Sequence, residues 1–416
     1  SAEGQTPPAR DAVFREFTGN ILAKKVAKFD TPVDWEEHRR SGVEPDARVL
    51  RGHVILGVKN AELPPEAREY KARVVGNGGQ LRDIWGQIAE VADLYTLPLG
   101  LQSFRLICAW ALANAARGYE VFAVDGAYLQ AVRRGPPTYL VLPAELMALL
   151  PEETQEKCRK MRTPSFRLLT PIYGETDAGD DWAAYFEAIL VRLGWRRLEA
   201  AGGEQLFLKD VPTDDASAPP VSLLLGMYVD DGAIAGPRDV VLAELNLIGQ
   251  EVVFKPPTAL QRFLGVQLHR TLRQDVPGMI LEQRAYAEHA IAAFEAEWVQ
   301  QPRAQAIPGL SLKQAEDQHG QSREGGRFAK TARTHLGALL YLARATRPDI
   351  AEAVASLARE VTQWGPACDA RLQRIFGYLR RTAASGLLSQ WASGSTDDAS
   401  RVVAAVAGVR SDATSA

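Results

Sequence analysis

The sequence predicts an α+β protein in which helices cover one side of an antiparallel sheet. Helical spacing over 103–116 is followed at once by a strand pattern at 120–125. A second helical pattern at 180–193 precedes strand patterns at 203–210 and 222–236, and the latter has the form of a hairpin. A helix at 239–247 follows that hairpin. This order of elements is typical of an antiparallel sheet with helical cover.

Length and composition limit the class of protein. The chain has 416 residues, which favours two or three domains over one core. The net charge of −3 argues mildly against a dedicated nucleic-acid binder, although it is compatible with an enzyme that has a local basic groove. We expect no membrane span and no secretion signal, because no 18-residue apolar run and no signal-peptide pattern occurs. Three widely spaced cysteines predict reduced thiols, and the six histidines form no zinc-type pair.

The remaining elements follow from the same rules. Residues 1–29 carry few periodic signals and are expected to be a loose leader. Turn residues predict that Gly194 ends the 180–193 helix and that Asp180 or Asp181 caps its start. Strands are expected at 51–58 and 70–75, which would form a hairpin, and at 138–143 and 263–270. A short strand is expected to run into a helix over 279–296, and 311–329 is expected to be an exposed loop. Helices are expected at 331–344, 348–363 and 368–382.

An acidic pair, Asp230-Asp231, interrupts the apolar stretch LLLGMYVDDGAIAG. Two ionised carboxylates about 5 Å apart repel each other by roughly 3 kcal/mol at an effective dielectric near 20, and a divalent cation removes that repulsion. The alternative is a solvated Asp-Gly hairpin turn without a metal. The apolar flanks and the preceding tyrosine favour the metal-binding interpretation.

The stretch GMYVDDGAIAG resembles the Tyr-x-Asp-Asp hairpin of reverse transcriptases, in particular the LLLYVDDxLIAG form of copia-type retrotransposon polymerases. Further stretches resemble that family in the same order along the chain. They are YKARVVGNGGQ (70–80), VDGAYLQAVRRGPPTYLVLP (124–143), LLTPIYGETDAGDDW (168–182), RFLGVQLHR (262–270), HLGALLYLARATRPDIAEAVASLAR (335–359) and RLQRIFGYLRRTAASGL (371–387).

The resemblance implies an RNA-directed DNA polymerase domain shaped as a right hand. It would bind an RNA or DNA template-primer and deoxynucleotide triphosphates, and would use Mg²⁺, with Mn²⁺ as an alternative. The implied regions are a leader at 1–29, fingers at 30–105 and 133–175, palm at 106–132 and 176–270, a helical thumb or connection at 271–387, and the start of an RNase H region at 388–416.

Roles carry over only at matching positions. The resemblance implies that the aspartate pair binds the metal ions and that the chain's fingers strand contacts the triphosphate. An aromatic residue would exclude a 2′-hydroxyl, and a primer grip would follow the palm. The residues implied are Asp230 and Asp231 (catalytic and metal-binding), Lys71, Arg73, Tyr128 and Asp177 (nucleotide-binding), and Tyr228, Phe263, Leu264 and Gly265 (primer-contacting).

The chain departs from the family pattern where a third catalytic aspartate is expected. An ungapped comparison places Ala123 at that position, with Asp125 two residues later. Residues two apart on a strand share a face but are displaced by about 6.6 Å. We favour the ungapped reading, which predicts a weakened metal site; a two-residue deletion would instead make Asp125 catalytic. Asp177 replaces a family glutamine and adds negative charge, and GNGGQ replaces a basic segment and removes positive charge.

Two interpretations therefore follow for function. One is an active polymerase domain of a retrotransposon polyprotein, with integrase and RNase H domains elsewhere, located in cytoplasmic virus-like particles or the nucleus. The other is a catalytically dead remnant that at most binds nucleic acid or a partner. A metal site of a nucleotide-sugar glycosyltransferase is disfavoured, because no Gly-rich strand-to-helix turn occurs in the first 120 residues.

Overall fold

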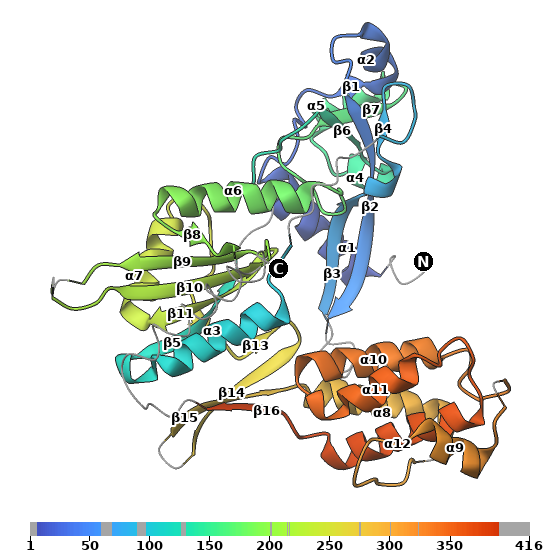
Figure 1. The fold of residues 1–416 in the computed structure, drawn as a ribbon. Helices are drawn as coiled ribbons and strands as arrows, with labels where there is room; N and C mark the ends of the chain where they lie inside the picture. Colours follow the sequence, from blue (N-terminus) through green and yellow to red (C-terminus); the bar gives the residue numbers. More distant parts are fainter. Residues whose placement is uncertain are drawn as a thin grey trace, which may run out of the picture.

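The computed structural model describes residues 6–59, 69–89, 97–125, 130–199, 202–213, 215, 217–273, 276–299, 301–322 and 324–390. It is a mixed fold with 42% helix and 25% strand, as the α+β class requires. The described strands form three sheets, and a helical bundle precedes the last strand in the chain (Figure 1). None of the described helices has the length and apolar character needed to cross a membrane.

The first sheet is mixed, in the order β1–β7–β6–β2–β3 with β4 added to β2, and its β2–β6 pair is parallel. Phe17 and Ile21 of the N-terminal segment pack in one core with Leu50, Leu140 and Phe166 of the sheet region. The elements here are α1 (Pro7–Glu16), η2 (Phe17–Leu22), β1 (Val33–Asp34), α2 (Trp35–Ser41), β2 (Arg48–Lys59), β3 (Glu69–Gly76), η4 (Gly78–Gln80), β4 (Arg82–Asp83), β6 (Thr138–Val141), α4 (Ala144–Met147), α5 (Glu152–Arg159) and β7 (Pro164–Arg167).

The second sheet is antiparallel at every pairing, in the order β12–β5–β11–β10–β9–β8. Figure 1 shows α6 on one face and α3 on the other, so the prediction of helices on only one side is wrong. Two apolar cores result, one toward α6 and α7 and one toward α3. The elements are α3 (Leu101–Ala113), η5 (Ala115–Arg117), β5 (Tyr119–Asp125), α6 (Ala178–Arg192), β8 (Arg196–Arg197), β9 (Leu206–Val211), β10 (Val221–Tyr228), β11 (Asp231–Pro237), α7 (Arg238–Ile248) and β12 (Thr258–Ala259).

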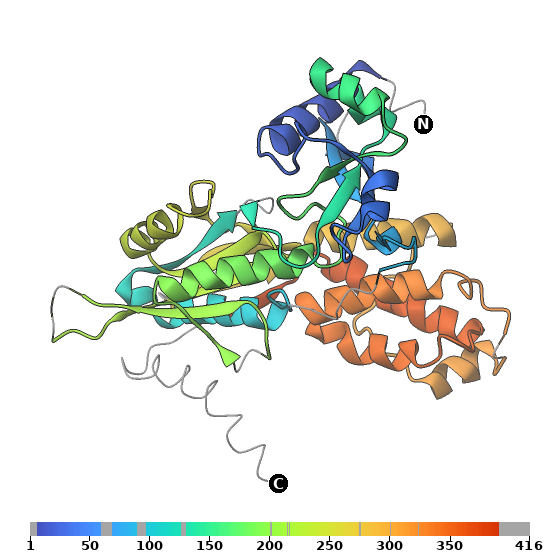
Figure 2. The same cartoon turned by 90° about the horizontal axis from the view of Figure 1, so that it is seen from above.

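The third sheet, β13–β14–β15–β16, leads into a bundle with its own core around Phe294, Leu339 and Phe376. Figure 2 shows this bundle gathered on one side of the molecule. The elements are β13 (Arg262–Phe263), β14 (Val266–Arg273), β15 (Val276–Glu282), α8 (Arg284–Trp298), α9 (Leu312–His319), α10 (Ala332–Ala345), η8 (Pro348–Ile350), α11 (Ala351–Ala358), α12 (Pro366–Thr382) and β16 (Leu387–Gln390).

Three expectations about segments are wrong. The leader is not loose, because α1 and η2 bury apolar side chains against the first sheet. Residues 311–329 are not all loop, since Ser311 and Gln314 form a capping box that starts α9. Residues 387–390 form a strand on β15, so the region predicted to begin at 388 as a weakly specified tail starts with part of the third sheet, and 391–416 lie outside the described residues.

Boundary corrections have local physical reasons. The expected strand at 263–270 is interrupted, because Leu264 and Gly265 both have positive φ and turn the chain between β13 and β14. Asp177, rather than Asp180 or Asp181, precedes α6, and Gly194 ends that helix in the left-handed conformation as predicted. The expected helix at 348–363 is the shorter η8–α11 pair. The β2–β3 hairpin is confirmed, although its connection at 60–68 lies outside the described residues.

Candidate active site

The acidic pair lies at the tip of the β10–β11 hairpin. Tyr228 is the register partner of Asp231, so Val229 and Asp230 form the loop and the Asp-Gly dipeptide is not the turn. Val229 has a φ of 59°, which is strained for a β-branched residue. Its carbonyl oxygen accepts a 2.5 Å hydrogen bond from Nε1 of the buried Trp182 on α6. This contact holds the tip against α6, leaving Asp230 half-buried and Asp231 exposed.

Strand β5 supplies the neighbouring chain segment. The register places Asp125 directly opposite Asp231, and Ala123 opposite Ala233. Directly opposed Cα atoms in antiparallel strands lie about 4.5–5.5 Å apart. Asp125 is therefore level with Asp231, while Ala123 is two positions farther from the hairpin tip. This register favours Asp125 over position 123 as the third acidic position, contrary to the ungapped reading of the sequence.

A pocket with a volume of about 740 Å³ opens beside the hairpin on the face toward α3. Tyr228, Asp231 and Ala123 line it from the sheet. Phe263, Leu264 and Gly265 line it from the β13–β14 turn. The structure therefore brings the predicted primer-contacting residues into one pocket with one of the two predicted catalytic aspartates.

Tyr341 of α10 fixes the β13–β14 turn from the bundle side. Its hydroxyl donates to the carbonyl oxygen of Leu264 at 2.7 Å. A Cβ at Gly265 would lie 2.4 Å from that hydroxyl oxygen, and Gly265 has a φ of 73°, so both space and backbone require glycine. Arg262 and Arg344 also line the pocket and give it positive charge near Asp231.

The two predicted fingers cations lie on one face of β3. Lys71 and Arg73 are exposed, whereas Ala72 and Val74 are buried, as period-two alternation requires. The Arg73 guanidinium lies 5.4 Å from the centre of the Tyr173 ring. Burial and the negative charge of Asp230 raise the pKa of Tyr173, and the charge of Arg73 opposes them. Tyr173 therefore lies within the electrostatic reach of both Arg73 and Asp230.

Asp177 lies at the start of α6 in a buried charge cluster. Arg133 forms an ion pair with Glu175 at 2.8 Å and lies 4.0 Å from Asp177. Burial raises the pKa of Glu175 to about 7, although Arg133 and the Ile172 amide favour its charged form. The negative charge that Asp177 adds is thus partly offset by Arg133. Tyr128 lies outside the described residues.

The donor chemistry of the tip is suited to a hard divalent cation, because carboxylate oxygens are the ligands Mg²⁺ prefers. Asp230 and Asp231 are adjacent at the tip, and the backbone of Asp125 lies across from Asp231. The side chains that the structure describes contain no cluster of three His, Cys, Asp or Glu groups that could hold a metal. The side chain of Asp125 is not one of the described side chains.

The sequence patterns did not reveal three residues that shape this region. Trp182 and Tyr173 both fall within the stretch at 168–182, but their contacts to Val229 and Arg73 join distant segments. Tyr341 falls within the stretch at 335–359, where a tyrosine on a helical face is more often a packing residue. In the comparison with known proteins, no family model and no curated protein matches this chain.

Proposed function

We propose that this chain is a reverse-transcriptase domain of the copia type, an RNA-directed DNA polymerase by ancestry. The observation that carries the proposal is the Asp230-Asp231 hairpin tip, with Tyr228 and Asp231 in one pocket with the β13–β14 turn. The order of the resembling stretches along the chain supports the proposal independently.

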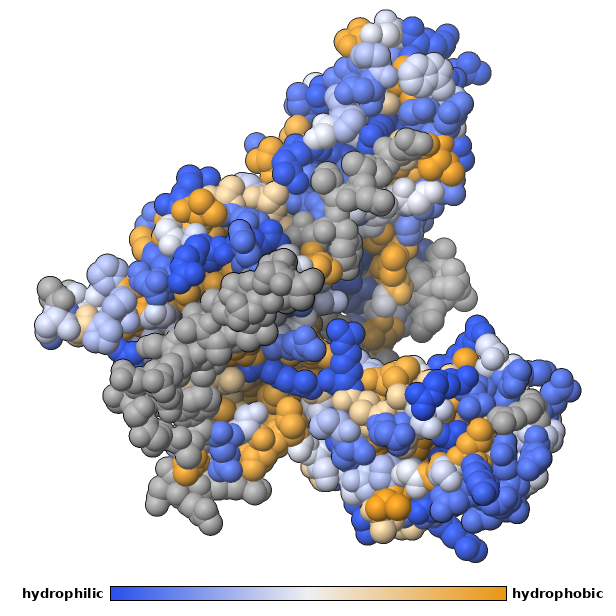
Figure 3. Space-filling view, viewed as in Figure 1, coloured by the Kyte–Doolittle hydropathy of each residue, from blue (hydrophilic) through white to orange (hydrophobic). Residues whose placement is uncertain are grey.

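In this proposal the three structural regions have the roles of a right hand. The first sheet is the fingers, the second sheet is the palm, and the α8–α12 bundle is the thumb. Figure 3 shows the surface indented between the β2–β3 arm and the bundle, where a template-primer duplex would lie. Arg262 and Arg344 on the pocket wall would contact backbone phosphates, which dominate protein–nucleic acid affinity.

The chemistry would be two-metal nucleotidyl transfer. Asp230 and Asp231 would hold Mg²⁺, with Asp125 as the third ligand, and the ions would activate the primer hydroxyl and neutralise the triphosphate. Arg73 would form charge-assisted hydrogen bonds to the triphosphate. Tyr228 and Phe263 would position the primer end. The chain would act within a polyprotein that carries integrase and RNase H activities, in virus-like particles or the nucleus.

Primer extension on an RNA template tests the proposal. We expect synthesis with Mg²⁺ or Mn²⁺, and a loss of at least about 100-fold in Asp230→Asn. Asp239→Asn, an exposed aspartate on α7, is the matched control and should retain full activity. No synthesis by the wild type under either metal would contradict an active polymerase.

The third ligand is tested separately. If Asp125 is the ligand, Asp125→Asn abolishes synthesis and Ala123→Asp changes little. If position 123 is the missing ligand, wild type is inactive and Ala123→Asp restores synthesis.

A second candidate function is nucleic-acid binding without catalysis. The observation that favours it is that Ala123, which cannot bind a cation, lines the same pocket as Asp231. This function predicts that wild type and Ala123→Asp both fail in primer extension, while a template-primer duplex still binds. Fluorescence anisotropy of a labelled duplex would show binding that weakens in Arg262→Ala. Retained synthesis by the wild type would exclude this candidate.

A further inference from the structure

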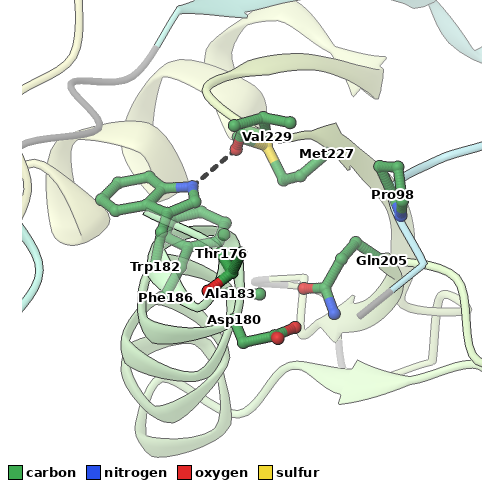
Figure 4. Close-up of a pocket in the computed structure, with 10 residues that line it drawn as sticks. Pro98, Thr176, Asp180, Trp182, Ala183, Phe186, Gln205, Met227 and Val229 are labelled. Atoms are coloured by element: carbon green, nitrogen blue, oxygen red, sulfur yellow. Dashed lines mark hydrogen bonds between the residues drawn. The ribbon is translucent and has the colours of Figure 1, made fainter. Parts of the chain in front are cut away.

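A separate pocket lies on the opposite, α6-covered side of the hairpin. It has a volume of about 250 Å³ and lies between α6 and the end of β10 (Figure 4). Trp182 and Phe186 of α6 and Met227 and Val229 of the hairpin form its apolar wall. The Trp182 and Phe186 rings are stacked, with centroids 5.6 Å apart and planes inclined by 12°, so the wall offers flat aromatic surface.

Gln205 supplies an unsatisfied polar group to this pocket. Its side chain is 4% exposed, and neither the Nε2 nor the Oε1 atom of its carboxamide has a hydrogen-bond partner within the described part of the chain. Figure 4 shows the carboxamide pointing into the pocket. Its backbone is fixed on both sides, because its amide donates to Leu97 and its carbonyl accepts from Met227. Burying such a group without partners is unfavourable, and a ligand with matching groups would offset that cost.

Asp180 faces the same space. Its side chain is 7% exposed and lines the pocket from the first turn of α6 (Figure 4). An ionised carboxylate only accepts hydrogen bonds, whereas the Gln205 carboxamide both donates and accepts. The pocket therefore combines a flat aromatic wall with acceptors for an N–H group and one donor for a ring nitrogen.

We propose that this pocket binds a planar heteroaromatic amine, a bicyclic ring with an exocyclic amino group beside a ring nitrogen. The amino group would donate to Asp180 and to the Gln205 oxygen, and the Gln205 nitrogen would donate to the ring nitrogen. The ring would lie against Trp182 and Phe186. A bicyclic ring fits the space, because an apolar cavity of about 150 Å³ already binds benzene. The proposal does not depend on polymerase activity.

Calorimetric titration of the full chain with 2-aminoquinoline tests this site. We expect saturable binding at one site, and at least about tenfold weaker binding of quinoline, which lacks the amino group. Gln205→Leu should weaken 2-aminoquinoline binding by about tenfold or more without lowering thermal stability, since it removes an unpartnered buried amide. Gln87→Leu, the same change at an exposed position, should leave binding unchanged.

A second variant keeps the test independent of the Gln205 substitution. Ala183 lines the pocket on α6, so Ala183→Leu should fill space and abolish binding while the circular dichroism spectrum is retained. Equal binding of 2-aminoquinoline and quinoline, or full binding by Gln205→Leu, would overturn the proposal.

The same ring chemistry occurs in free small molecules and in the bases of a strand. Competition by free adenine supports a small-molecule site. Competition by adenine and by a single-stranded oligo(dA) alike supports a site that also accepts strand bases. Competition by the oligonucleotide but not by free adenine would overturn the proposal of a small site for one planar ring.

Discussion

Replacement of Gly265 by alanine tests the contact that fixes the β13–β14 turn beside the hairpin. An alanine in the left-handed region costs about 1–2 kcal/mol. The new Cβ would also lie 2.4 Å from the Tyr341 hydroxyl oxygen. Relieving that overlap costs a further 1–3 kcal/mol or so. We therefore expect Gly265→Ala to lower the free energy of unfolding by about 2–5 kcal/mol.

A double-mutant cycle separates the two contributions. Tyr341→Phe removes the hydroxyl that donates to Leu264, at a cost of about 1 kcal/mol, and also removes the atom that the alanine Cβ meets. The double variant should therefore be more stable than the sum of the single effects, with a coupling of at least about 1 kcal/mol. Gly118→Ala is the matched control, because Gly118 has a φ of 76° but no atom within 4 Å of its Cβ position.

Urea unfolding followed by tryptophan fluorescence provides the measurement. Gly118→Ala should show the backbone cost alone, about 1–2 kcal/mol. The reasoning is refuted if Gly265→Ala is no less stable than Gly118→Ala, or if the cycle is additive. In the first case the overlap with Tyr341 is relieved at no cost, and in the second case Tyr341 is not the neighbour responsible.

Three further predictions concern the charge cluster at Glu175, the buried Arg347 of the bundle and the N-terminal cap of α9. Burial raises the pKa of Glu175 from 4.5 to about 7, so between these pH values the folded protein retains a proton that the unfolded chain releases. The free energy of unfolding should therefore fall as pH rises from 4.5 to 7, by up to about 3 kcal/mol relative to Glu175→Gln. Urea unfolding of both proteins at each pH provides the measurement. Equal pH profiles for the two proteins would contradict this. Arg347 is 2% exposed and donates hydrogen bonds to Asp349 and Thr382. Arg347→Ala should therefore lower the free energy of unfolding by about 3 kcal/mol. The control Arg359→Ala, at an exposed position, should lower it by less than about 0.5 kcal/mol. Ser311→Ala removes the α9 capping box and should increase hydrogen exchange of α9 amides by about fivefold, or about 1 kcal/mol; unchanged exchange would count against the cap.

The sequence determined the local structure of the second sheet. A continuous apolar run on either side of the acidic pair predicted the β10–β11 hairpin, and the periodic segment at 180–193 predicted α6 with Gly194 at its end. These features depend on neighbours within a few residues, where period and turn chemistry act directly. The capping box at Ser311 was also readable as Ser-x-x-Gln, but the polar composition of the segment concealed it.

The relative position of distant segments was decided only by the tertiary structure. The register of β5 against β11 places Asp125 level with Asp231, and no pattern within either strand fixes the pairing between them. The turn at Leu264 requires a positive φ that the apolar run conceals, and Tyr341 holds it from a helix far along the chain. The pocket at Gln205 likewise exists only where α6 meets β10. By itself the sequence determined which elements form and which chemistry they carry, because those depend on neighbouring residues; packing between segments decided which carboxylates, rings and amides meet.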